Sequence, residues 1–302
     1  MTKFKFLLFI AVLVGFAALA HAGLYEGTTA YIRHDFAKAY AELKPLAEQG
    51  NAKAQVFLAF MYDEGHGVTQ DYAEAVKWTR KAVAQGDADA QYLLGQMYHD
   101  GHGVPQDYAE ALKWYRKAAA QGEVPARSDL GWMYAHGEGV PQDYAVAAKW
   151  FREGAEQSLS SAQYALGWLY LHGHGVPQDY AEAVKWFRKS AEQGVAMAQS
   201  NLGLMYAKGQ GVPQDYAEAA KWFREGAEQG DTIAQFNLGL MFHDGEGLPQ
   251  DSVQALKWLS ISASQGDAES QKFRDLLAEK MTPAQIEEAQ RLARKWKPKG
   301  QD

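Results

Sequence analysis

Histidines are the residues of this sequence whose type and spacing come nearest to a reactive site. Two of them, His172 and His174, form a His-x-His pair, and imidazole pairs of this kind bind zinc or copper. The equivalent turn positions also hold Glu138, Gln210 and Glu246, which favours exposed turn residues without a fixed role. We therefore expect no metal site and no cofactor, with a histidine metal site as the alternative. The histidines at or beside short glycine turns are His66, His99, His102, His136, His172, His174 and His243.

The rest of the sequence has none of the common catalytic motifs that we considered. There is no cysteine, which excludes disulfides, thiolate metal sites and cysteine nucleophiles. The patterns Gly-x-Ser-x-Gly, Ser-x-x-Lys and His-Glu-x-x-His are absent, as is a phosphate-binding glycine loop. Repeated carboxylates such as Asp107 and Glu110 are explained by helix capping. We expect a protein that is not an enzyme.

Composition narrows the class of protein further. The 302 residues are 47% hydrophobic and 22% charged, which is ordinary for a folded chain and excludes global disorder. The net charge is -7, which argues against a nucleic-acid partner.

The N-terminus has the pattern of a secretory signal peptide. Lys3 and Lys5 precede an apolar run over residues 6–20, and Ala20-His21-Ala22 fits a small-x-small cleavage site. The run is shorter than the roughly 20 residues of a membrane span. We expect residues 1–22 to be removed during export, with an uncleaved anchor as the alternative. The mature chain would then have no membrane span and would lie in the periplasm or outside the cell.

The rest of the chain repeats every 36 residues. Three residue types share this period, so the body is an array of similar structural units. An aspartate recurs at Asp71, Asp107, Asp143, Asp179, Asp215 and Asp251. A tryptophan recurs at Trp78, Trp114, Trp150, Trp186, Trp222 and Trp258, and a turn glycine at Gly67, Gly103, Gly139, Gly175, Gly211 and Gly247.

Each unit is predicted to be a pair of helices. In the first helix, Ala90, Leu94 and Met97 lie on one face, and Gly95 beside them indicates close approach of the partner helix. A Gly-x-Gly turn follows. The second helix is expected to start at Asp107 with an Asp-x-x-Glu capping box. Because neither helix can bury its apolar face alone, stacking predicts an all-α fold, a right-handed α-solenoid of antiparallel helix pairs with a concave side.

The motifs Ala-Gln-x-x-Leu-Gly-x-Met-Tyr, Gly-x-Gly-Val-Pro-Gln-Asp-Tyr and Ala-x-Lys-Trp resemble those of the Sel1-like repeat family, a relative of the tetratricopeptide repeat. By this resemblance residues 51–266 hold six repeats. Residues 23–50 are expected to form an N-terminal capping hairpin of tetratricopeptide type, and residues 267–302 C-terminal capping helices with a basic tail.

Departures from the repeat are where a binding site is expected. Ser158 replaces the glycine that closes the other second helices, so we expect a strained helix end there. Two positions of the first helix vary and would line the concave groove of a tetratricopeptide-like stack. They hold Phe60, Gln96, Trp132, Trp168, Leu204 and Leu240 at one, and Asp129, Asn201 and Asn237 at the other. The open alternative is that Trp132 and Trp168 pack between repeats.

The resemblance implies a non-catalytic adaptor of the bacterial envelope, expected as a monomer, that binds a protein or peptide segment in this groove. A secreted host-interaction or virulence factor using the same groove is an alternative. A third interpretation is a β-lactam- or peptidoglycan-binding enzyme, which some cysteine-rich members of the family suggest. The missing cysteines and the missing Ser-x-x-Lys motif speak against that activity here.

Overall fold

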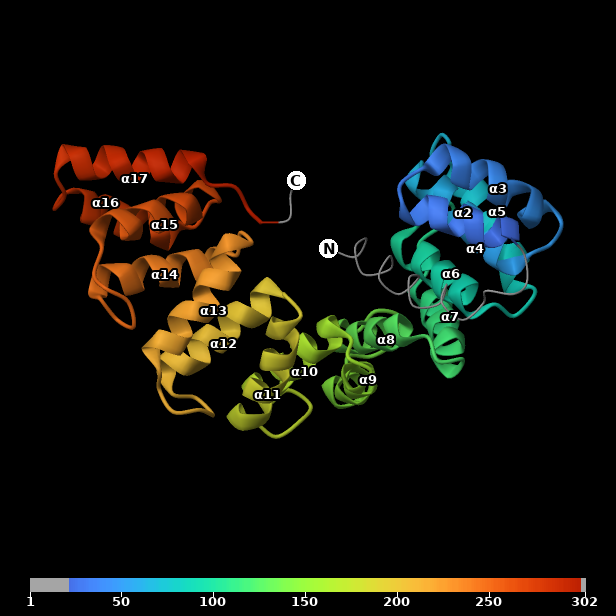
Figure 1. Cartoon of the computed structure of the whole chain (residues 1–302). Coiled ribbons are helices and arrows are strands. Elements are labelled where there is room, and N and C mark those ends of the chain that lie inside the picture. Colours follow the sequence, from blue (N-terminus) through green and yellow to red (C-terminus); the bar gives the residue numbers. More distant parts are fainter. Residues whose placement is uncertain (1–21, 300–302) are drawn as a thin grey trace. The chain divides into compact units, whose positions relative to one another are not determined.

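The structure, a computed structural model, describes residues 22–299, and all of its regular elements are helices (Figure 1). Residues 1–21, and with them nearly all of the expected signal peptide, lie outside the described residues. The helices are α2 (Ala22–Ile32), α3 (Phe36–Glu48), α4 (Ala52–Glu64), α5 (Tyr72–Val83), α6 (Ala88–Asp100), α7 (Tyr108–Ala120), α8 (Val124–His136), α9 (Tyr144–Glu156), α10 (Ser160–His172), α11 (Tyr180–Glu192), α12 (Ala196–Lys208), α13 (Tyr216–Glu228), α14 (Thr232–Asp244), α15 (Ser252–Ser264), α16 (Ala268–Ala278) and α17 (Pro283–Lys295).

The helices fall into two compact units, α2 to α8 within Met1–Gln142 and α9 to α17 within Asp143–Asp302. Inside each unit, the helices from α2 to α16 pack against their neighbours in the chain. Contacts of this nearest-neighbour kind are typical of a solenoid. The predicted all-α stack of helix pairs is therefore confirmed within each unit. The even-numbered helices are called first helices below, and the odd-numbered ones second helices.

Glycine allows the two helices of a pair to approach closely. A Cβ added to Gly95 of α6 would lie 2.6 Å from the Tyr115 ring of α7. A Cβ at Gly167 of α10 would likewise lie 2.8 Å from the Phe187 ring of α11. The close approach expected at this position is therefore observed, and it explains a residue that otherwise disfavours helix.

The Gly-x-Gly turn of each helix pair packs against the preceding helix pair. Gly101 ends α6 in the left-handed region, at φ 77°, and its N–H donates to the carbonyl of Met97. Gly103 comes so close to the preceding pair that a Cβ would lie 2.3 Å from the Tyr72 carbonyl oxygen. The Gln106 amide then donates to the His99 carbonyl at 2.8 Å, which closes the turn. These contacts place the second helix of one pair against the turn of the next.

Second helices begin at the aspartate that the sequence indicated, but the expected capping box is only half formed. Asp107 Oδ1 accepts from the N–H groups of Ala109 and Glu110 at 3.0 Å. The Glu110 side chain does not return to the cap. It accepts instead from Lys113 and from the Trp114 indole N–H. These partners lie one turn further along the same helix, so the reciprocal half of the prediction was wrong.

A buried glutamine links successive pairs. The Gln163 amide of α10 donates to the Ala155 carbonyl at the end of α9, and the Gln193 amide donates in turn to Gln163 Oε1 at 2.7 Å. The same arrangement recurs at Gln55, Gln199 and Gln235. In α8 this position holds Arg127, so the glutamine ladder is interrupted in the last helix of its unit.

The C-terminal end departs from the regular pairing. Thr282 and Gln285 form a full capping box at the start of α17, with Pro283 in the first turn. α17 then packs extensively against α15, whereas it makes few contacts with α16, the helix that precedes it. The Trp296 ring after α17 meets the Trp258 ring of α15 edge-on at 6.1 Å.

Candidate interaction surface

The first helices carry the exposed apolar side chains. Within residues 22–299, six large hydrophobic residues have 36% to 56% of their surface exposed, and every one lies on a first helix. The second helices instead expose charged residues such as Lys185 and Glu182, which pair at 2.8 Å. The exposed six are Tyr25, Trp132, Met197, Ile233, Phe273 and Leu276.

The residues expected to line a groove differ in exposure. Trp132 is exposed, whereas the other residues of the two predicted positions are half-buried. This half-buried set comprises Phe60, Gln96, Asp129, Trp168, Asn201, Leu204, Asn237 and Leu240. The assignment of these residues to a binding groove stays a prediction.

Four exposed residues of the second unit were not among the predicted site residues. Phe273 and Leu276 lie 36 residues after Asn237 and Leu240, so the repeat period itself pointed to them. The sequence-based prediction assigned residues 267–302 to C-terminal capping helices, because the repeat motif does not continue into them. Met197 and Ile233 occupy matching places in the first turns of α12 and α14, which pack against each other. We call Met197, Ile233, Phe273 and Leu276 the apolar strip.

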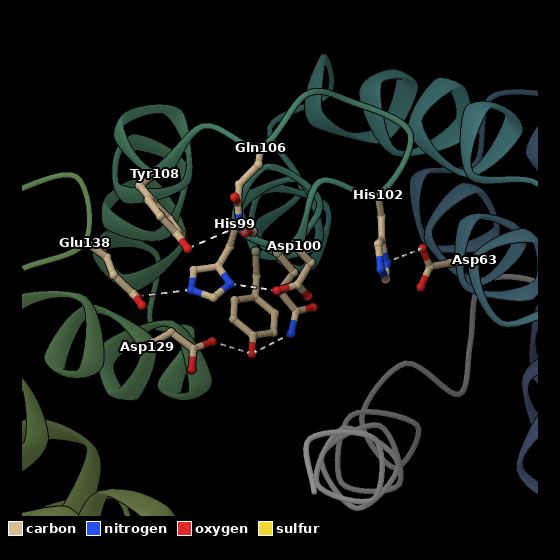
Figure 2. A network of polar contacts seen from close by, with 10 residues as sticks. Asp63, His99, Asp100, His102, Gln106, Tyr108, Asp129 and Glu138 are labelled. Atoms are coloured by element: carbon tan, nitrogen blue, oxygen red, sulfur yellow. Dashed lines mark hydrogen bonds and ion pairs between the residues drawn. The ribbon is translucent and has the colours of Figure 1, made fainter. Parts of the chain in front are cut away.

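Polar side chains beside these apolar residues are held in place. The Asn201 and Asn237 amides donate to the Met197 and Ile233 carbonyls four residues earlier, both at 2.8 Å. In the first unit, the Tyr92 hydroxyl donates to Asp129 Oδ2 at 2.8 Å and accepts from the Gln96 amide (Figure 2). Burial, and then the nearby Asp129 carboxylate, raises the pKa of Tyr92.

Trp168 lies in a cluster with histidine. Its ring centroid is 4.4 Å from that of His172 and 5.1 Å from that of His174, and the two imidazoles stack 5.8 Å apart. His172 Nδ1 lies 2.9 Å from the Trp168 carbonyl oxygen. Trp132 stacks in the same manner on His136. The imidazoles thus support the tryptophan rings.

The turn histidines stack on aromatic rings of the preceding pair. His66 lies on Phe36 at 4.1 Å and His102 on Tyr72 at 4.4 Å. His102 Nδ1 is also 3.5 Å from Asp63 Oδ1 (Figure 2). In the part of the chain that the structure describes, no group of three or more histidine, aspartate or glutamate side chains is arranged to hold a metal ion.

His99 lies between two carboxylates (Figure 2). Its Nδ1 is 2.7 Å from Asp100 and its Nε2 is 3.1 Å from Glu138. The hydrogen bond with Asp100, and then that with Glu138, raises the pKa of His99 to about 9 despite partial burial. The imidazole is therefore charged at neutral pH, and it joins α6 to the turn that follows α8.

A second charged cluster lies where α4, α6 and α8 begin. Lys53 contacts the carboxylates of Asp89 and, at 3.2 Å, Asp87. Glu123 is only 7% exposed, and its Oε2 has no hydrogen-bond partner among the described residues. Burial, and then hydrogen bonding to Asp89, raises the pKa of Glu123 to about 8. Glu123 thus holds a proton at neutral pH, chiefly because burial disfavours its charged form.

No helix among residues 22–299 combines the length and the apolar character that a membrane crossing requires.

Comparison with known proteins agrees with the repeat period. The family described as Sel1 repeat matches six consecutive segments, residues 52–87, 88–123, 124–159, 160–195, 196–231 and 232–267. No curated protein matches.

Two solved structures share the fold. One is c5321, described as a protective antigen present in uropathogenic Escherichia coli strains displaying an SLR fold. It is 40% identical with a TM-score of 0.77, over 84% of this chain and 56% of that one. This chain therefore spans little more than half the length of c5321. The other is a Sel1 repeat protein from Oxalobacter formigenes. It is 34% identical with a TM-score of 0.74, over 80% of this chain and 99% of that one.

Proposed function

The chain belongs to the Sel1 repeat family, and from this premise we propose that it is a non-catalytic scaffold that binds a protein or peptide segment through its first helices. One observation carries the proposal: all six exposed large hydrophobic residues of the described chain lie on first helices. Exposed apolar side chains on adjacent helices, such as Met197 and Ile233 on α12 and α14, are typical of a docking surface.

The second unit offers the longer surface. Met197 and Ile233 are matched on adjacent helices, and the Phe236 ring contacts Phe273 at 5.6 Å, which joins α14 to α16. Asn201 and Asn237 supply hydrogen-bonding groups beside the apolar residues. Apolar anchors flanked by polar groups are the usual composition of a binding hot spot. In the first unit, Trp132 is the corresponding anchor.

Export is part of the proposal. A basic start, an apolar run and Ala20-His21-Ala22 favour cleavage of residues 1–22 and a periplasmic protein. The hairpin of α2 and α3 and the helices α16 and α17 would then act as the caps of the array.

Loss of the apolar strip tests the proposal. Ile233→Gln with Phe273→Gln removes two anchors, and Lys189→Gln with Glu225→Gln changes two exposed positions on second helices as the control. The tagged proteins are crosslinked in intact cells, and co-purified proteins are quantified. A partner recovered with the wild type and the control should fall at least tenfold with the strip variant. Equal recovery from all three would contradict the assignment.

The likeness to a protective antigen favours a second candidate, in which the same surface meets a host protein outside the cell. Cell fractionation separates the two candidates. Antibody labelling of intact cells, together with protein in the culture medium, would support the host-facing form. Recovery only from the periplasmic fraction would support the envelope scaffold.

A further inference from the structure

A cavity of about 730 Å³, open to solvent on one side, lies at the C-terminal end of the second unit. It arises because α17 packs against α15 and makes few contacts with α16. Its wall comes from the ends of α13 and α15, from α16 and α17, and from the residues that follow α17 (orange to red in Figure 1). Its volume is in the range of small-ligand sites.

The chain after α17 closes one side of this C-terminal cavity. Trp296 packs edge-on against Trp258, and Pro298 lies against Gly230. The Lys299 N–H donates to the Glu228 carbonyl at 2.8 Å, and its ammonium pairs with the Glu228 carboxylate. These contacts hold the wall in place without a ligand.

The charged residues that line the cavity are all positive. Arg274 from α16 and Arg294 from α17 line the cavity, and no aspartate or glutamate does. Arg274 is held by Asp275 at 2.7 Å. The Arg294 guanidinium makes no hydrogen bond or ion pair with any of the described residues. A planar guanidinium with free donors favours a carboxylate ligand.

Two glutamine side chains that line the cavity offer hydrogen-bond acceptors to a ligand. The amide groups of Gln229 and Gln265 donate to Gln199 and Gln235, so that each side-chain oxygen is left as an acceptor. Ile261, Ala293 and Trp296 supply apolar surface. A ligand that fits this lining carries a carboxylate, N–H donors and an apolar group.

These are the groups of a peptide C-terminus. We propose that the C-terminal cavity binds the terminal carboxylate of a short peptide, with Arg294 and Arg274 on the carboxylate, the glutamine oxygens on backbone N–H groups, and Trp296 beside an apolar side chain. The site is separate from the apolar strip and does not depend on binding there.

Calorimetry with defined probes tests this site on the full mature protein. The probes are N-acetyl-Ala-Ala-Leu with a free carboxylate, the same peptide as its C-terminal amide, and succinate. The free acid should bind at least tenfold more tightly than the amide. Arg294→Gln and Arg274→Gln should each weaken binding of the free acid about tenfold. Arg291→Gln is the control, because Arg291 lies on the same helix, pairs with Glu288 and does not line the cavity.

Four results would overturn the proposal. The first is equal binding of acid and amide. The second is unchanged affinity of the Arg294 variant, with unaltered circular dichroism showing that it is folded. The third is no saturable heat with any probe. Succinate binding as tightly as the peptide would contradict the peptide assignment and identify a free dicarboxylate as the ligand.

Discussion

Ser158 stands where the other second helices end in glycine. It adopts φ 63°, in the left-handed region, whereas the equivalent Gly122 and Gly194 have φ 100° and 85°. A side chain in this region costs about 1–2 kcal/mol. The strain expected from the sequence at this position is therefore present.

Ser158→Gly is expected to raise the free energy of unfolding by about 1 kcal/mol, because it removes this cost. Chemical denaturation followed by circular dichroism measures the change. Gly194→Ser is the matched reverse variant and should lower the stability by a similar amount. If Ser158→Gly lowered the stability, the strain would be wrongly assigned.

Gly167 is a residue at which helix propensity and packing give opposite expectations. Alanine favours helix by about 1 kcal/mol over glycine. Its Cβ, however, would lie 2.8 Å from the Phe187 ring, which is fully buried. Overpacking of a core costs about 1–3 kcal/mol. We expect Gly167→Ala to lower the melting temperature, and a higher melting temperature would show that the ring can move aside.

At the scale of the element, the start of α8 differs from those of α6 and α14. Asp87 and Asp231 cap the first helices α6 and α14 with their side chains. Glu123 makes no such bond, and it lies buried beside Asp89 and Lys53. The longer side chain thus enters a charged cluster instead of capping its helix.

This cluster predicts a pH dependence confined to the first unit. The folded state raises the Glu123 pKa from 4.5 to about 8, so the native protein binds a proton that the unfolded chain releases. The resulting contribution to stability is greatest below pH 4.5 and is lost as the pH rises to about 8. His99, whose pKa is raised from 6.5 to about 9, acts in the same direction over the higher part of the range.

Thermal denaturation from pH 5 to pH 9 measures this effect. Glu123→Gln should flatten the fall between pH 5 and pH 8, because the amide does not titrate. Glu192→Gln, an exposed position at the end of α11, is the control and should keep the wild-type profile. A Glu123→Gln profile that follows the wild type would contradict the assignment.

Elements also show which parts of the fold the sequence could predict. The aspartates and glycines on the 36-residue period marked the helix starts and turns, because capping and left-handed turns each demand a particular residue. The side-chain partners of Glu110 could not be predicted, since Lys113 and Trp114 compete with the cap for the same carboxylate. The packing of α17 on α15 could not be predicted either, because the repeat motif ends before it.

For the molecule as a whole, the apolar strip could be predicted only in part. The period placed Asn201, Asn237, Leu204 and Leu240 on first helices, and continuing it by one repeat would have found Phe273 and Leu276. The packing of neighbouring side chains determines which of these residues are exposed. The repeat period does not specify those side chains. The cluster of Glu123, Asp89 and Lys53 likewise joins three first helices, and each of its residues is unremarkable in its own repeat.

The central claim is that first helices, and not second helices, meet the partner. Site-specific photo-crosslinking tests it most directly, with a photoreactive phenylalanine analogue placed at Ile233 or Phe273 on first helices and at Lys189 or Glu225 on second helices. After irradiation of intact cells, a discrete adduct should form from positions 233 and 273 and not from 189 or 225. Adducts from positions 189 and 225 alone would contradict the account.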